Sequence, residues 1–205
     1  MIVEKNSSIN NSLGISATCK YLLTVETEND FDELKDFLTN NKEKFYIVGE
    51  ATNLVLPNYY DGIIIRPIFN TCIEDKANNI LKVGAAYNWT DLVNFCISKN
   101  INGFENLIDI PGSVGASPIQ NIGAYGVEVA SLIESIDCYC LTEFKKINLT
   151  NSECNFVYRN SSLKNSKRLI YNINFITNKE SNLSINYQTI RDYIKENNIK
   201  ANSMA

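Results

Sequence analysis

The sequence has no histidine among its 205 residues, and this absence excludes several kinds of site. Neither a Ser-His-Asp nor a Cys-His nucleophile can be built, and the usual Cys/His zinc patterns cannot be drawn. The 6 cysteines are scattered without a C-x-x-C pair, which favours reduced, buried thiols and no metal site. Acid–base chemistry must therefore use Tyr, Ser, Lys, Arg, Glu, Asp or a cofactor.

Long apolar runs and blocks of basic residues are also missing. No run approaches the roughly 20 apolar residues of a membrane helix, and the opening "MIVEKNSSIN" is too polar for a signal peptide. We therefore expect a cytoplasmic protein without a membrane span. The net charge is −4 with both signs mixed, so nucleic acid is not an expected partner. We expect a monomer.

Two common nucleotide-binding motifs are absent as well. No G-x-G-x-x-G opens a helix after a strand, and no glycine is followed by lysine as a P-loop requires. A nucleotide would have to be held by another arrangement.

Strand and helix patterns are both present, which predicts an α+β fold. Apolar and β-branched segments predict strands at 20–27, 44–50, 62–67, 79–85, 131–142, 144–149 and 168–177. Helical spacing predicts helices at 29–40, 88–100 and 187–200. The polar, turn-like stretch 70–78 suggests a boundary between a small α/β part, 1–75, and a larger part, 76–205.

The segment "GFENLIDIPGSVGASPIQNIGAYGVEV" (103–129), here called the glycine window, concentrates the few glycines of the chain. It holds five of the 9, namely Gly103, Gly112, Gly115, Gly123 and Gly126. Small residues over such a length let a flat ligand lie against the backbone, with the amides of Gln120 and Asn121 beside it. The alternative is a glycine-rich loop packed against its own core.

Two further stretches have the composition of anion sites. In "YIVGEATNLVL", Gly49 is expected to take an uncommon backbone conformation, so that successive N–H groups form a nest for a phosphate. A plain turn between two strands is the alternative. In "FVYRNSSLK", Arg159 beside Tyr158 offers a planar fork for a carboxylate or phosphate, or else a simple surface pair.

Taken together, "GEATN", the glycine window and "FVYRNSSLK" resemble the UDP-N-acetylenolpyruvoylglucosamine reductases, also called UDP-N-acetylmuramate dehydrogenases. "NNSLGI" (10–15) and "LKVGAAYNW" (81–89) fit the same resemblance, which runs from about residue 10 to about residue 190. It implies the two-subdomain FAD-binding fold of the vanillyl-alcohol oxidase/PCMH type. It also implies FAD as cofactor, NADPH as reductant and a UDP-sugar substrate, UDP-N-acetylglucosamine enolpyruvate, which is reduced to the peptidoglycan precursor UDP-N-acetylmuramate.

The resemblance also assigns residues. Arg159 matches the catalytic arginine, which stabilises the charge developing toward the substrate carboxylate, and Tyr158 and Tyr187 are assigned to substrate binding. The FAD pyrophosphate is expected against Gly49, Glu50, Ala51, Thr52, Asn53 and Leu54. The ribityl chain and isoalloxazine are expected against Pro111, Gly112, Ser113, Gly115, Ala116, Ser117, Gln120, Asn121, Gly123, Ala124, Tyr125 and Gly126.

The sequence departs from the family pattern in two places that matter. Ala51 and Thr52 stand where the family usually has glycine and serine, and alanine tolerates positive φ poorly, so an altered phosphate turn is expected. The family's proton-donating serine and C-terminal glutamate have no counterpart before Ala205. We therefore expect a truncated chain without the C-terminal substrate domain and with little turnover of its own. The alternatives are an FAD-binding module or degenerate remnant, and a flavin oxidase acting on another substrate.

Overall fold

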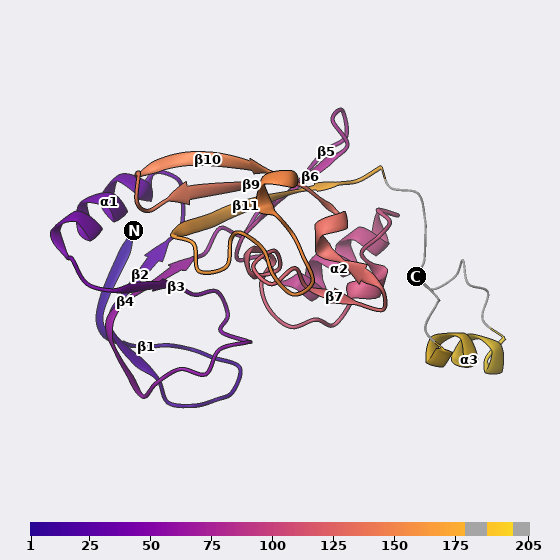
Figure 1. Cartoon of the computed structure of the whole chain (residues 1–205), viewed down its shortest axis with the longest axis horizontal. Coiled ribbons are helices and arrows are strands. Elements are labelled where there is room, and N and C mark those ends of the chain that lie inside the picture. The colour runs from indigo at the N-terminus through magenta and orange to yellow at the C-terminus, as the bar shows by residue number, and fades with distance from the viewer. Residues whose placement is uncertain (179–187, 199–205) are drawn as a thin grey trace.

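The computed structural model describes residues 1–178 and 188–198. Residues 1–178 form two main sheets, each with one helix packed against it (Figure 1). The first sheet has the order β1-β2-β4-β3. Its strands are β1 (Ile2–Ser8), β2 (Thr18–Val25), β3 (Phe45–Ile47) and β4 (Tyr59–Pro67). β1 pairs antiparallel with β2, whereas β2 and β3 both run parallel to β4. Helix α1 (Asp30–Asn40) packs against this sheet.

The second sheet is antiparallel throughout and has the order β10-β9-β11-β6-β5. Its strands are β5 (Cys72–Asp75), β6 (Ile80–Gly84), β9 (Ile133–Cys140), β10 (Lys145–Thr150) and β11 (Arg168–Ile176). Between β6 and β9 come α2 (Trp89–Ser98), the two-residue strands β7 (Gly123–Ala124) and β8 (Val127–Glu128), and short 3₁₀ turns. Helix α3 (Gln188–Glu196) follows near the C-terminus.

Three groups of buried side chains hold these elements together. The largest lies under the second sheet and α2 and includes Trp89, Leu92 and Phe175. A second joins α1 and the first sheet to the ends of β9 and β11, where Phe31 stacks on Tyr139 with ring centroids 4.2 Å apart. Because β9 and β11 contribute to both groups, they connect the two halves of the molecule, and Figure 1 shows them extending over both.

Most predicted elements are confirmed within a few residues. The apolar run at 62–67 is buried on both faces of β4, because Ile63 and Ile65 enter one core group and Ile64 enters another. The helix predicted at 88–100 forms α2, which buries Trp89, Leu92, Val93 and Cys96 and leaves Phe95 half-buried.

The two-residue strands β7 and β8 were not predicted, and neither were two strands of the main sheets. The opening segment forms β1, although it was interpreted only as a polar start, and the turn-like stretch at 70–78 contains β5. Both are edge strands with exposed side chains, so their sequences lack the apolar pattern of a buried strand. The division into parts 1–75 and 76–205 stays a prediction.

Candidate cofactor-binding site

The turn after β3 takes its unusual conformation at Ala51, which has φ of 53° and is buried. The prediction that Gly49 supplies this conformation is wrong, because Gly49 is not among the residues with positive φ. Gly49 is needed for another reason: a Cβ there would lie 2.8 Å from Ser113 Oγ. Ala51 therefore carries the left-handed geometry, despite its Cβ, at the place where the resembled family usually has glycine.

Replacing Ala51 with glycine is expected to raise the free energy of unfolding by about 0.5–1 kcal/mol. Glycine removes the steric cost of the left-handed conformation, which outweighs its greater freedom in the unfolded chain. Urea unfolding of both proteins measures the difference. The control is Ala77→Gly in an exposed turn without positive φ, which should give a small loss. A loss at Ala51 as large as the loss at Ala77 would contradict the prediction.

This turn and the start of the glycine window meet in space, although they are far apart in the sequence. Gly112 has φ of 122°, and a Cβ on it would lie 2.9 Å from Thr52 Oγ1. The Thr52 hydroxyl donates a hydrogen bond to the Pro111 carbonyl at 3.5 Å. Together with the contact between Gly49 and Ser113, these approaches make one continuous wall from two segments predicted separately to bind the same cofactor.

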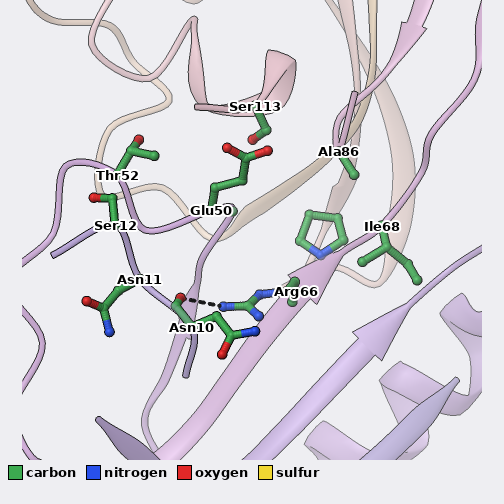
Figure 2. Close-up of a pocket in the computed structure, with 11 residues that line it drawn as sticks. Asn10, Asn11, Ser12, Glu50, Thr52, Arg66, Ile68, Ala86 and Ser113 are labelled. Carbon is green, nitrogen blue, oxygen red and sulfur yellow. Dashed lines mark hydrogen bonds between the residues drawn. The ribbon is translucent and has the colours of Figure 1, made fainter. Parts of the chain in front are cut away.

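A cleft of about 450 Å³ opens beside this wall (Figure 2). Its lining consists of Asn10, Asn11, Ser12, Gly49, Glu50, Thr52, Arg66, Pro67, Ile68, Ala86 and Ser113. Gly49, Glu50, Thr52 and Ser113 were predicted as cofactor residues. The resemblance of 10–15 and 81–89 covers Asn10 to Ser12 and Ala86 without assigning them a role.

Arg66 was missed as a site residue. The available signal was one cation in the otherwise apolar run "GIIIRP". Its Nη2 donates to the Asn10 carbonyl at 3.3 Å, and its Nε is buried without a hydrogen-bond partner. Burial lowers the pKa of the guanidinium, which nevertheless stays protonated at neutral pH.

The later glycines of the window serve the packing of the chain itself. A Cβ on Gly115 would lie 2.6 Å from the Cβ of Ala85, and one on Gly123 would lie 2.7 Å from the Val127 carbonyl oxygen. Gly126 has φ of 82° in the tight β7–β8 hairpin. The alternative of a packed glycine-rich loop therefore holds for the later part of the window. The start of the window borders the cleft, and its contact with a flat ligand stays a prediction.

The surface of this remainder is mixed. Pro111, Ala116, Tyr125 and Gly126 are exposed, Gly115, Gln120, Gly123 and Ala124 are half-buried, and Ser117 is buried. None of residues 115–126 lines the cleft. Their contact with the ring end of a flavin stays a prediction, as does that of Asn53 and Leu54, which are exposed beyond the cleft lining.

Asn121 is fully buried and its amide bonds only to protein groups. Its Nδ2 donates to Glu128 Oε2 at 2.8 Å and to the Val157 carbonyl at 3.2 Å, and its Oδ1 accepts from the Ala130 N–H at 3.1 Å. The expected contact of this side chain with a ligand stays a prediction. Within the protein, Asn121 fastens the glycine window to the segment that carries Arg159.

That segment is a tight two-residue turn. The backbone groups of Val157 and Asn160 exchange hydrogen bonds of 3.0 and 3.1 Å, which leaves Tyr158 and Arg159 at the tip. Arg159 has φ of 53°, an uncommon conformation for a bulky residue and one often found at functional sites. Its Nη2 donates to the Gly123 carbonyl at 2.6 Å, and its guanidinium lies 5.7 Å from the Tyr158 ring centroid.

The structure thus brings Arg159 to the glycine window, while Tyr158 stands 81% exposed beside it. The hydroxyl of Ser161 adds a second connection by donating to the Ile119 carbonyl at 3.0 Å. Tyr187, the other residue assigned to the substrate, lies outside the described residues.

The cysteines have no part in this site. All six are free, and burial raises the pKa of Cys138 to about 12 and that of Cys154 to about 11. Such thiols stay protonated at neutral pH, which agrees with reduced structural cysteines. No group of His, Cys, Asp and Glu that could hold a metal occurs within residues 1–178 and 188–198. No helix in the same part of the chain is long and apolar enough to cross a membrane.

The residues at the cleft suit a flavin dinucleotide. A volume of about 450 Å³ is typical of a small-molecule site. An unpaired, partly buried guanidinium and a turn with a left-handed residue suit an anionic diphosphate.

Comparison with known proteins agrees with this interpretation. Residues 19–140, more than half of the chain, match the family model described as FAD binding domain. The chain is 36% identical over 160 residues to a UDP-N-acetylenolpyruvoylglucosamine reductase of Shewanella sp. (strain ANA-3), covering 77% of this chain and 47% of that protein. It is 38% identical over 157 residues to the Salmonella typhimurium protein of the same name, covering 76% and 46%.

Solved structures support the fold. The UDP-N-acetylenolpyruvylglucosamine reductase of Thermus caldophilus matches with a TM-score of 0.67 at 23% identity, covering 91% of this chain and 64% of that one. An alkyldihydroxyacetonephosphate synthase matches with a TM-score of 0.57 at 11% identity, covering 79% and 32%. These likenesses confirm the predicted α+β, two-subdomain FAD-binding fold of the vanillyl-alcohol oxidase/PCMH type.

The fold and the matched model define the class of protein, a flavin-binding domain. The chain belongs to the FAD binding domain family and, within it, to the UDP-N-acetylenolpyruvoylglucosamine reductase family. It spans about half the length of the curated relatives it matches.

Proposed function

We propose that this chain binds FAD with the adenosine diphosphate part in the cleft and the flavin part along the glycine window. The observation that carries the proposal is the meeting of the two turns, Gly49 against Ser113 and Thr52 against Gly112. A dinucleotide needs both a phosphate turn and a surface that continues from it. The packing of residues far apart in the sequence supports such a continuous site.

We further propose that the whole protein reduces UDP-N-acetylglucosamine enolpyruvate to UDP-N-acetylmuramate with NADPH. The names of the relatives support the reaction class, and the bound flavin would supply the hydride chemistry. Arg159 would act as a fixed cation for the negative charge that develops toward the substrate carboxylate. Tyr158, exposed beside it, would contact the substrate.

The position of Arg159 fits that role. One of its N–H groups is held by the Gly123 carbonyl, and a guanidinium has five donors, so others stay available to a carboxylate. Because the turn conformation and this bond fix the side chain, little reorganisation would be needed during reaction.

Titrating the purified, flavin-free protein with FAD tests the first proposal. Quenching of flavin fluorescence should saturate at one FAD per chain. Absence of binding would refute the assignment of the cleft.

NADPH oxidation by the whole protein with the UDP-sugar substrate tests the second proposal, because this chain by itself is expected to show little turnover. Replacing Arg159 with alanine should lower product formation while FAD stays bound, because Arg159 does not line the cleft proposed for the adenosine diphosphate part. If the Arg159→Ala variant no longer bound FAD, the role of Arg159 would be structural. Saturable FAD binding without any NADPH oxidation would favour the alternative of an FAD-binding module.

A further inference from the structure

Arg66 occupies an unusual place for a cation. It lies near the end of β4 between the buried residues Ile65 and Pro67, and it faces the cleft. Its one hydrogen bond within the described residues goes to the Asn10 carbonyl, and that bond is long at 3.3 Å. The buried Nε has no partner. Most of the donor capacity of this guanidinium is therefore unused by the protein.

In the described part of the chain, the charge of Arg66 has no carboxylate partner. Across residues 1–178 and 188–198, none of the ion pairs includes Arg66. Glu50 also lines the cleft, but in Figure 2 its carboxylate points toward Ser113 whereas Arg66 points toward Asn10. A partly buried cation without a counter-charge lowers the stability of the folded chain, so its presence calls for a ligand.

The surroundings indicate what kind of ligand fits. The hydroxyl residues Ser12 and Thr52 line the same cleft, and the Ala51 turn lies directly beside Thr52. Each hydroxyl now donates only a long hydrogen bond, Ser12 to the Ala51 carbonyl at 3.4 Å and Thr52 to the Pro111 carbonyl at 3.5 Å, which a phosphate oxygen could replace. Hydroxyls, turn N–H groups and a guanidinium fork are the groups that bind phosphate oxygens. A neutral or cationic ligand would leave Arg66 unpaired.

We propose that Arg66 binds the diphosphate of the dinucleotide in this cleft. Without the ligand, the unpaired charge of Arg66 lowers the stability of the folded chain. This inference rests on the proposed binding of FAD. It assigns the main charged contact to β4 and gives the turn at Gly49–Asn53 the supporting role of backbone donor.

Two substitutions test the inference by FAD titration of the full chain. Arg66→Met keeps the apolar stem and removes the charge, and it should weaken FAD binding by about 10- to 100-fold. Arg66→Lys keeps a positive charge but lacks the planar guanidinium fork. Its FAD affinity should lie between the affinities of the parent and of the Met variant. Thermal unfolding without FAD should show the Met variant to be at least as stable as the parent, since an unpaired buried group is removed. A residue with a purely structural role would show the opposite change in stability.

Arg168→Met is the matched control, because it removes the same charge from a residue outside the cleft lining and should leave FAD affinity unchanged. Equal FAD affinity of the parent and Arg66→Met would overturn the inference while leaving FAD binding itself established. An equal loss in the Met and Lys variants, or a less stable Met variant, would also overturn it, because shape and not charge would then be responsible. A parent chain that binds no FAD would remove the proposed function and this inference together.

Discussion

Replacing Gly84 with alanine is expected to lower the free energy of unfolding by about 3 kcal/mol and to weaken FAD binding with it. A Cβ at this position would lie 2.3 Å from the Phe69 carbonyl oxygen, 2.6 Å from its carbon and 2.9 Å from the Thr71 nitrogen. These are backbone atoms. They are held by hydrogen bonds from Gly84 to Thr71 and from Ala86 to Phe69, so they cannot move aside as a flexible side chain would.

The effect should reach the cleft because the clash lies beside it. Ile68 and Ala86, the neighbours of the crowded segments, both line the cleft. Urea unfolding, followed by the fluorescence of the single tryptophan, Trp89, measures the free energy of unfolding. FAD titration measures the affinity of the cleft for FAD. The comparison is Gly14→Ala, where a Cβ meets nothing within 4 Å but φ is +64°. That variant should lose only about 1 kcal/mol. If the two variants were equally stable, the backbone at Phe69 would have to be free to shift.

The sequence was informative where side chains are buried in a regular pattern. β4, β6 and β11 were predicted because apolar residues follow one another along each strand. The strands missed in the two main sheets, β1 and β5, lie at sheet edges. Such strands are held mainly by backbone hydrogen bonds to one neighbour, and their exposed side chains carry little signal.

At the site, the sequence identified the segments that meet but not the roles of individual residues. The turn at 49–53 was found, yet the left-handed residue is Ala51 and not Gly49. A positive φ depends on the path of the whole folded turn, which residue types alone do not fix. Arg66 was interpreted only as part of an apolar strand. The cleft that it faces is lined by segments before and after it in the sequence, so the strand alone does not reveal the cleft.

The interpretation of Asn121 shows the same limit. A side-chain amide in a glycine-rich segment suggested contact with a ligand. Its partner at Val157 is 36 residues away, and only the folded chain reveals that the amide is already used. The turn that carries Arg159 is therefore held in part by Asn121, a buried residue in another segment.

Replacing Asn121 with aspartate is therefore expected to lower the free energy of unfolding by about 3–5 kcal/mol at neutral pH. The two side chains have nearly the same shape, but aspartate has no N–H donor. Its oxygen would face the Glu128 carboxylate and the Val157 carbonyl across the 2.8 and 3.2 Å now bridged by hydrogen bonds. Burial and the neighbouring Glu128 carboxylate disfavour the charged form of an aspartate at position 121, so the pKa of that aspartate rises in the folded variant, which then binds more protons than the unfolded chain. Its deficit in stability should shrink as the pH falls.

The turn at Arg159 should also be released, which gives a readout independent of stability. Trypsin cleaves after arginine, so the bond between Arg159 and Asn160 should be cut faster in the Asn121→Asp variant under conditions where both proteins are folded. Asn155→Asp is the matched control: Asn155 also has positive φ, 45°, but it is exposed and its Nδ2 donates only locally, to the Glu153 carbonyl at 3.1 Å. That variant should lose less than about 1 kcal/mol and keep the cleavage rate of the parent. Comparable losses at the two positions, or unchanged cleavage after Arg159 in the Asn121 variant, would mean that the turn is held by the Arg159–Gly123 and Ser161–Ile119 bonds without help from Asn121.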